Sequence, residues 1–205
     1  MSLLLPTLCQ QPAQQRAPSF HSTSLEVKYA AFFRNVNLGR PNCPSKAQLE
    51  SAFTRAGAVR ATSFLTNGTI VFDAPPGIRA RKILVAAHQN LQIECGLKEP
   101  AYVRTVKHLA ELVALEPFAS LERASVYEFC VSFLPPQEVT LLALPMKSKR
   151  QDVELLRSTG TEVLSVSRKI GNTPGSPNAY LEKLLDAAVT TRAWNTVVRL
   201  VQRHA

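Results

Sequence analysis

The sequence predicts an α+β protein in two halves, the first with a ferredoxin-like βαββαβ arrangement. Three observations support this fold class. Apolar residues alternate between strand and helix spacing in the order strand, helix, strand, strand, helix, strand over residues 27–104. An Asn67-Gly68 pair, a strong hairpin signal, separates the middle two strands. The 205 residues are 45% hydrophobic and 19% charged, which suits a chain with a sizeable core.

The first strand and helix are indicated by composition and capping. Tyr29–Phe33 (YAAFF) has the character of a short buried strand, and the Pro- and Gly-containing stretch 34–44 is typical of a loop. Ser45 and Gln48 form a capping-box pattern at the start of a helix, and Gly57 ends it.

The remaining elements of the first half follow in order. Residues 59–65 and 69–72 are expected to form the hairpin, and a second helix follows Pro75-Pro76. Residues 101–104 are the fourth strand. Two helices on one face of an antiparallel sheet give the ferredoxin-like arrangement.

The second half is less regular. Thr105 can cap a helix that ends at Pro117. Four further strands are predicted at Ser125–Leu134, Val139–Leu144, Val153–Leu156 and Glu162–Val166. Helices are predicted at Asn178–Asp186 and from Thr191 or Arg192 to the end of the chain. The loop 145–150 holds Lys147, Lys149 and Arg150, and Gly171–Pro177 (GNTPGSP) is a second loop.

The domain boundaries follow from these elements. Residues 1–26 are expected to be a disordered extension, 27–104 the ferredoxin-like subdomain, and 105–205 a second α+β subdomain that ends in a helix. No apolar run reaches the length of a membrane span, so we expect a cytoplasmic protein without a membrane partner. A mitochondrial matrix location is the alternative if residues 1–25, which lack acidic side chains, are a transit peptide.

Charge favours anionic partners. The net charge is +9, spread along the chain without a long basic run, and nucleic acid or a phosphorylated small molecule would complement it. The four cysteines are widely separated and the histidines show no paired spacing, so neither a metal site nor another cofactor is predicted. Phosphate-loop and nucleophile-elbow motifs are absent, which leaves enzymatic activity open but favours a non-enzymatic protein.

Six residues are candidates for an anion site. Arg34 and Asn37 lie in the loop after the first strand, where side chains often carry function. The others lie at or near the start of the last helix, whose N-terminus attracts negative charge: Thr191, Arg192, Asn195 and Arg199. The alternative is structural: Arg34 pairs with an acid inside the protein, and the helix face is merely solvated.

Trp194 belongs to a different pattern. With Val197, Val198 and Val201 it forms one apolar stripe at helical spacing, so it is predicted to pack in the core rather than to stack on a ligand. An RNA-recognition motif is not predicted, because the glycine-aromatic signature of such sheets is absent.

Four stretches resemble one protein family in its own order. FFRNVNLG (Phe32–Gly39) is similar to that family's LLRGINVGG, and SFLTNGTIVF (Ser63–Phe72) to its TYIQSGNVVF. AYVRTVKHLAELVALEPF (Ala101–Phe118) resembles VIVRTAEELEAIVAANPF, and VTTRAWNTVVRL (Val189–Leu200) resembles ATTRNWNTVTKL. The family is the domain of unknown function 1697 family of uncharacterised bacterial proteins. The resemblance implies an α+β fold of two related halves and implies no activity.

The leading functional hypothesis is a non-enzymatic protein that binds an anionic ligand, with nucleic acid as the first candidate. A protein-interaction or self-associating module is the alternative, and an enzyme acting on a small phosphorylated substrate ranks third. A contiguous positive surface favours the first, an exposed apolar patch the second, and a polar pocket the third. The oligomeric state is left open.

Overall fold

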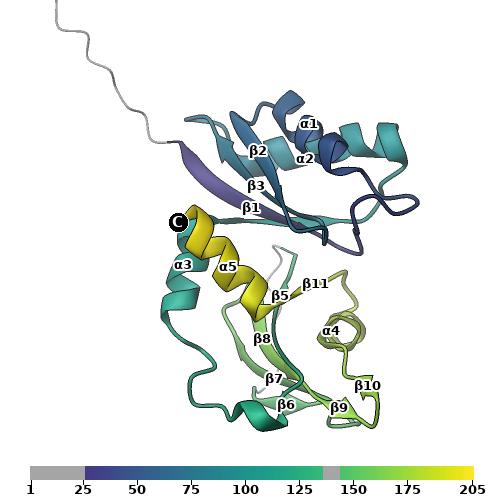
Figure 1. Ribbon diagram of the computed structural model, residues 1–205, viewed down its shortest axis with the longest axis vertical. Helices are drawn as coiled ribbons and strands as arrows, with labels where there is room; N and C mark the ends of the chain where they lie inside the picture. The colour runs from purple at the N-terminus through teal and green to yellow at the C-terminus, as the bar shows by residue number, and fades with distance from the viewer. Residues whose placement is uncertain (1–25, 136–143) are drawn as a thin grey trace, which may run out of the picture.

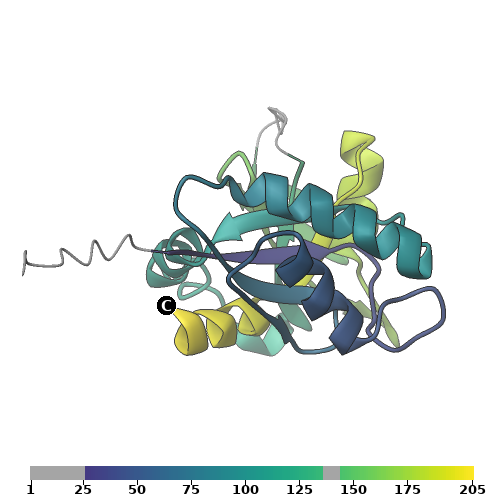
Figure 2. The same ribbon diagram turned by 90° about the horizontal axis from the view of Figure 1, so that it is seen from above.

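The first half contains the predicted order of elements. The computed structural model describes residues 26–135 and 144–205 (Figure 1). The elements of the first half are β1 (Val27–Phe33), α1 (Lys46–Arg55), β2 (Arg60–Phe64), β3 (Thr69–Ala74), α2 (Ala80–Cys95) and β4 (Ala101–Thr105). The strands form an antiparallel sheet in the order β2-β3-β1-β4, and α1 and α2 lie on one face of it (Figure 2).

Local sequence explains the boundaries of these elements. The predicted capping box is present, since the Ser45 side chain accepts from the Gln48 backbone and Gln48 reaches back to Ser45. The hairpin also forms at the predicted place, but its loop has four residues, from Leu65 to Gly68, instead of two. A Cβ at Gly68 would lie 2.6 Å from the Cβ of Val36, so only glycine fits there.

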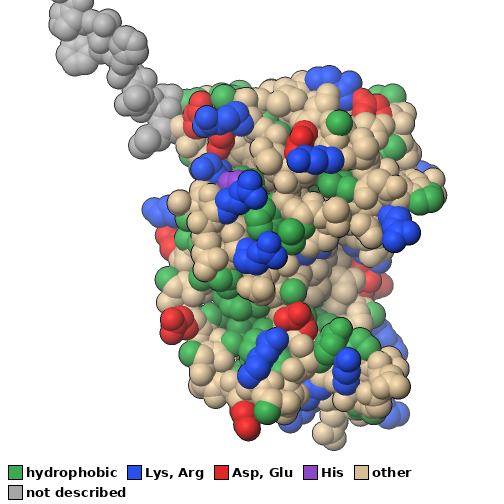
Figure 3. Space-filling view, viewed as in Figure 1, with side chains coloured by type: hydrophobic (Ala, Val, Ile, Leu, Met, Phe, Trp, Pro, Cys, Tyr) green, Lys and Arg blue, Asp and Glu red, His purple; other side chains and the backbone are tan. Residues whose placement is uncertain are grey.

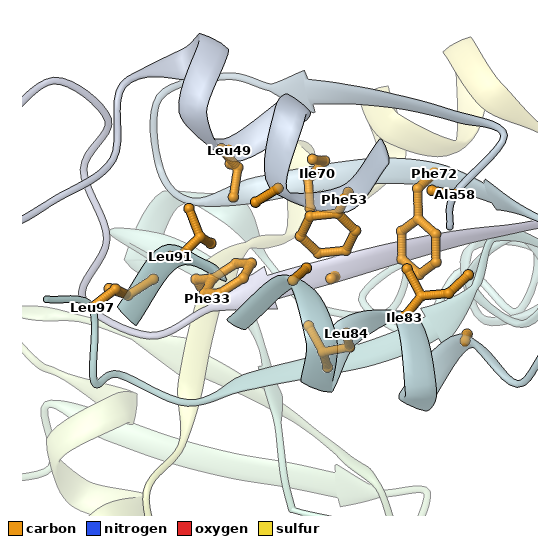
Figure 4. Packing of buried hydrophobic residues seen from close by; sticks show 14 of the residues in the cluster. Phe33, Leu49, Phe53, Ala58, Ile70, Phe72, Ile83, Leu84, Leu91 and Leu97 are labelled. Carbon is orange, nitrogen blue, oxygen red and sulfur yellow. The ribbon is translucent and has the colours of Figure 1, made fainter. Parts of the chain in front are cut away.

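The helix-facing side of this sheet carries the first hydrophobic cluster. Aromatic and aliphatic side chains from β1 and β3 interlock with those of α1 and α2 (Figure 4). The fully buried large members are Phe33, Leu49, Phe53, Ile70, Phe72, Ile83 and Leu91. Burying a side chain of this size contributes roughly 1.5–3 kcal/mol, so this cluster holds both helices on the sheet.

The second half begins with a helix and ends with a helix. Its elements are α3 (Val106–Ala114), the 3₁₀ turn η1 (Arg123–Ser125), β5 (Glu128–Phe133), β6 (Met146–Lys147), β7 (Val153–Ser158), β8 (Glu162–Ser167), β9 (Lys169–Ile170), β10 (Thr173–Pro174), α4 (Pro177–Leu185), β11 (Thr190–Ala193) and α5 (Trp194–His204). Thr105 caps α3 as predicted, because its side chain accepts from the His108 backbone.

Several predictions for this half are wrong. Helix α3 ends at Ala114 rather than at Pro117, and the predicted loops at 145–150 and 171–177 contain the short strands β6 and β10. The last helix starts at Trp194, and the preceding residues Thr190–Ala193 pair with β5 as strand β11. The strand predicted at Ser125–Leu134 is shorter, because its first residue belongs to the 3₁₀ turn η1. The extension at residues 1–25 and most of the strand predicted at Val139–Leu144 lie outside the described residues.

The second sheet repeats the strand order of the first. It runs β11-β5-β8-β7-β6, and without β6 this matches β4-β1-β3-β2. In each half the last strand leads directly into a helix, β4 into α3 and β11 into α5. Helix α4 follows β8 as α2 follows β3. The two halves are therefore related in topology.

The two sheets pack against each other through the faces that α1, α2 and α4 leave free (Figure 1). Phe32 of β1 stacks on Phe133 of β5, with ring centroids 3.9 Å apart. Helices α3 and α5 pack together beside these sheets. Trp194 is partly buried in the same cluster and meets the ring of Phe118 edge-on, as expected of a packing residue.

One arginine from each half crosses this interface. Arg192 of β11 is buried, and its guanidinium carbon lies 5.8 Å from the centre of the Phe32 ring. Its N–H groups donate over 2.7–3.1 Å to five neutral oxygens: the carbonyls of Phe33, Asn67 and Thr191 and the hydroxyls of Thr69 and Thr190. Burial lowers the pKa of Arg192 to about 10, so it stays charged at neutral pH.

Arg104 of β4 makes the corresponding contacts from the other side. Its guanidinium carbon lies 5.7 Å from the centre of the Phe133 ring. It donates to the carbonyl of the preceding residue, Val103, and to the carbonyls of Leu134 and Thr161 in the second half. Its Nε pairs with Glu162, at the start of β8, whereas the matching position at the start of β3 is Thr69. Among the described residues, Arg104 therefore has a carboxylate partner and Arg192 has none.

We expect Arg192→Lys to lower the free energy of unfolding by about 2–4 kcal/mol, because an ammonium has three donors for five buried acceptors. Chemical denaturation measures this change. Arg199→Lys on the exposed face of α5 is the control and should change stability by less than about 0.5 kcal/mol. Equal stability of the two variants would contradict the structural role of Arg192.

Glu162 should make the free energy of unfolding depend on pH in the acidic range. Burial alone would raise its pKa, but the Arg104 charge and the hydrogen bonds from Thr159, Arg104 and His108 outweigh burial and lower it. A carboxyl with a lowered folded-state pKa contributes stability above its unfolded pKa of about 4.3. This stability is lost as the pH falls through the folded-state value.

We therefore expect Glu162→Gln to lose less unfolding free energy than the unchanged protein does when both are acidified below about pH 4.3. The measurement is denaturant unfolding over a pH series. Glu111→Gln serves as the control, since the Glu111 side chain is 62% exposed. If acidification weakens the Glu162→Gln variant as much as the unchanged protein, the carboxylate does not carry this dependence.

Candidate functional site

The predicted site residues occupy different parts of the molecule. Arg34 is part of an ion-pair cluster, in which its Nε donates to Glu182 over 2.5 Å and its Nη1 to Glu99 over 2.6 Å. The hydrogen bonds to Glu182 and Glu99 raise the pKa of Arg34. The structural alternative, pairing with an acid inside the protein, therefore describes the contacts of Arg34. This cluster ties the end of β1 to α4.

The predicted placement of Arg192 on an exposed helix face is wrong. Arg192 lies in β11 because that segment pairs with β5, and its side chain is buried between the two sheets. Thr191 neither caps the last helix nor faces an open site. Its hydroxyl lies 2.7 Å from that of Ser132 and 3.2 Å from the Asn178 side-chain oxygen. Arg192 therefore joins β11 to the first half, and Thr191 joins β11 to β5 and α4.

The other three candidates are exposed. Asn37 lies in the loop after β1, and Asn195 and Arg199 lie on the outer face of α5. Within residues 26–135 and 144–205, neither Arg199 nor the neighbouring Arg203 forms an ion pair. The structure therefore does not bring the six predicted residues together into one site.

A different group of cations does converge on a cavity. It has a volume of about 540 Å³ and lies between the loop that precedes β7 and one face of α4. Its lining residues are Ser148, Lys149, Arg150, Asp152, Val153, Pro174, Ser176, Ala179, Tyr180, Lys183 and Leu184. The volume falls in the range of small-molecule sites. We refer to it below as the α4 cavity.

The floor of the α4 cavity is a tightly bonded turn. The buried Ser148 hydroxyl donates to Asp152 over 2.8 Å and accepts from the Val153 backbone over 3.1 Å. The Gln151 backbone donates to the Ser148 carbonyl and takes a positive φ of 59°. These bonds fix the backbone from which Lys149 and Arg150 project, so the two cations extend from a rigid support.

The GNTPGSP loop closes one end of the cavity. A Cβ on Gly175 would lie 2.1 Å from the Asp152 carbonyl oxygen, so this close approach requires glycine. The Gly175 carbonyl accepts from the buried Ser167 hydroxyl over 2.7 Å. Ser176 then caps α4 by accepting from the Ala179 backbone. The two loops are thus locked to each other at this contact.

The electrostatics of the α4 cavity are positive. Lys149, Arg150 and Lys183 line it and are exposed, and Asp152 is its one carboxylate among the lining residues. Arg150 Nε lies 3.3 Å from Oδ2 of Asp152, and the other carboxylate oxygen, Oδ1, accepts from the Ser148 hydroxyl. The cavity therefore keeps an excess of positive charge, which suits an anionic ligand.

Sequence reasoning found the two loops but not the cavity. The cations at Lys149 and Arg150 and the GNTPGSP segment were each identified as loop features. Lys183 lies on α4, more than thirty residues after Lys149. Proximity of the three depends on the packing of α4 against β7, which no local pattern reveals.

Cys130, His88 and His108 are buried or hydrogen-bonded within the fold. Burial raises the pKa of the Cys130 thiol to about 12, which makes it a poor nucleophile at neutral pH. His88 is hydrogen-bonded to the Glu99 carbonyl and His108 to Glu162. The described side chains include no group of three or more His, Cys, Asp or Glu arranged to hold a metal ion.

The first sheet does not offer an open aromatic surface. The face that a nucleic-acid-binding sheet of this type would expose carries Phe32, which is fully buried against the second half. On the other face, Tyr29 and Phe72 stack beneath the helices. Among the described helices, none combines the length and apolar character that crossing a bilayer requires.

Comparisons with known proteins agree with this fold. Residues 27–163 match the model of a family described as "Protein of unknown function (DUF1697)". The chain belongs to this family. No curated protein matches the chain. The description of the family assigns no function to the residues of the α4 cavity.

A solved structure supports the architecture. The chain is similar to a conserved bacterial protein, SP0830 from Streptococcus pneumoniae, with a TM-score of 0.61 and 15% sequence identity. The similarity covers 87% of this chain and 98% of that protein. At this identity the likeness shows the shared fold.

Gly175→Ala tests the junction between the two loops. We expect it to lower the free energy of unfolding by about 2–4 kcal/mol, because the new Cβ would overlap the Asp152 backbone. Gly39→Ala is the control, since its Cβ would meet no atom within 4 Å, and its positive φ of 81° adds a backbone strain that does not arise at Gly175. It should lose only about 1–2 kcal/mol. A Gly175 variant as stable as the control would show that the contact is not tight.

Proposed function

We propose that this protein is a non-enzymatic binding protein for a small anionic ligand, and that the α4 cavity is its binding site. The observation that supports this proposal is the convergence of Lys149, Arg150 and Lys183 on one cavity. They come from two separate elements that face each other. A cation on each side allows a bound anion to be held between them rather than at an open surface.

The chemistry of the three cations favours phosphate groups. Arg150 presents a planar guanidinium that matches phosphate geometry, and the two lysines supply compact charges around it. The volume of about 540 Å³ suits a small molecule better than a nucleic-acid strand. The ligand class supported by the cavity is thus a phosphorylated small molecule.

Nucleic acid is a second candidate ligand, and its surface is different. Lys and Arg side chains gather over α5 on the face shown in Figure 3. Arg199 and Arg203 are exposed there. A strand that lies along α5 would contact phosphate through these arginines, and its binding would weaken steeply with salt.

Titration calorimetry with pyrophosphate tests the proposal directly. We expect saturable binding, and we expect Lys149→Gln and Lys183→Gln each to weaken it about three- to tenfold, because each removes one exposed charge–phosphate contact. Lys82→Gln, on the exposed face of α2, is the matched control and should leave binding unchanged.

The same titration distinguishes the two ligands. If pyrophosphate does not bind at about 50 mM salt, the proposal fails. If a single-stranded oligonucleotide binds and loses affinity in Arg199→Gln but not in Lys149→Gln, the surface of α5 is the binding site and the α4 cavity is not. The log–log slope of affinity against salt should then decrease by roughly one per phosphate contact removed.

A further inference from the structure

We infer that the ligand of the α4 cavity is an organic phosphate ester with a flat apolar group, rather than a bare inorganic anion. This inference rests on the proposed function and adds the class of ligand. It follows from the cavity's two unlike sides. One side, formed by the turn before β7, presents Lys149 and Arg150, and the other, formed by α4, is largely apolar.

The apolar side is continuous. Tyr180 and Leu184 are four residues apart and so lie next to each other on one face of α4, and Ala179 also lines the cavity. Pro174 extends this side beyond the start of the helix. Leu184 is 40% exposed. An apolar group bound here would remove this surface from water.

Tyr180 is held in place within this side. Its hydroxyl donates over 3.2 Å to the carbonyl of Lys147, on the strand that enters the cationic turn. The hydrogen bond fixes the direction of the ring while the rest of the side chain borders the cavity. A fixed aromatic side chain is well suited to contact a flat ring of a ligand.

Lys183 connects the two sides. It lies on α4 between Tyr180 and Leu184, so its charge is placed beside the apolar side and opposite Arg150. A phosphate held between Lys183 and the cationic turn would leave its organic group against Tyr180 and Leu184. An inorganic phosphate would fill only part of about 540 Å³ and leave the apolar side in water.

Phenyl phosphate, inorganic phosphate and phenol are the probes that test this arrangement, with the full chain titrated by calorimetry at low salt. We expect phenyl phosphate to bind at least about tenfold more tightly than inorganic phosphate, which corresponds to roughly 60 Å² of apolar area removed from water. Phenol alone should bind weakly or not at all, because it lacks the charge that the cations attract.

Two variants test whether the higher affinity for phenyl phosphate comes from contacts with the apolar side. Leu184→Ala and Tyr180→Ala should each reduce the preference for phenyl phosphate over inorganic phosphate at least about threefold while leaving the affinity for inorganic phosphate unchanged. Lys149→Gln should weaken both phosphates by the same factor. Thermal unfolding checks that each variant is folded, and the exposed Leu184 provides the test if Tyr180→Ala is unstable.

The outcomes separate this inference from the proposed function. Equal affinity for the two phosphates overturns the inference and leaves the proposed function standing. A preference that Leu184→Ala does not reduce also overturns it, since the gain would then come from elsewhere. If neither phosphate binds, the proposed function itself fails.

Discussion

The structure depends on the packing of two related sheets, and two arginines cross that interface in opposite directions. Phe32 and Phe133 stack at its centre, with the guanidinium of Arg192 near one ring and that of Arg104 near the other. Each arginine donates to carbonyls in the opposite half, which lie at strand ends and in hairpin turns. An apolar side chain in either place would remove these hydrogen bonds, and a buried carbonyl left without a donor costs more than the hydrogen bond itself contributes.

The packing of α4 on the second sheet and its ion pair with Arg34 of the first half determine where the cavity forms. Glu182 on α4 binds Arg34 of the first half and accepts from the Val189 backbone, so the helix is held from its outer side. Lys183 follows Glu182 in the sequence and lines the cavity, so its charge projects from a helix whose position is fixed. Ion pairs of half-exposed groups contribute little stability by themselves. Their effect here is to set the position of a helix whose other side lines the α4 cavity.

Much of the fold could be predicted from sequence, because its signals are local. The capping box at Ser45, the hairpin at Asn67-Gly68 and the cap at Thr105 each depend on residues within four positions of each other. The candidate site was predicted less well. Arg192 was expected on a helix surface because its neighbours carry a helical apolar stripe, but pairing of β11 with β5 overrides that local preference. Strand pairing between distant segments has no local signature.

A basic sequence without a basic run can still concentrate positive charge at one cavity. Among the arginines predicted to bind anions, Arg34 is neutralised by carboxylates and Arg192 is enclosed by neutral oxygens, so neither contributes an open charge at the surface. The cations that do converge come from a turn whose backbone is fixed by Ser148 and from a helix that lies opposite it. Tertiary packing therefore brings these positive charges together, although the residues that carry them are not all consecutive in the sequence. The close contact of Gly175 with the Asp152 backbone holds the loop in place, so the cations stay close together without a ligand. A cavity that is preorganised in this way loses less conformational freedom when a ligand binds.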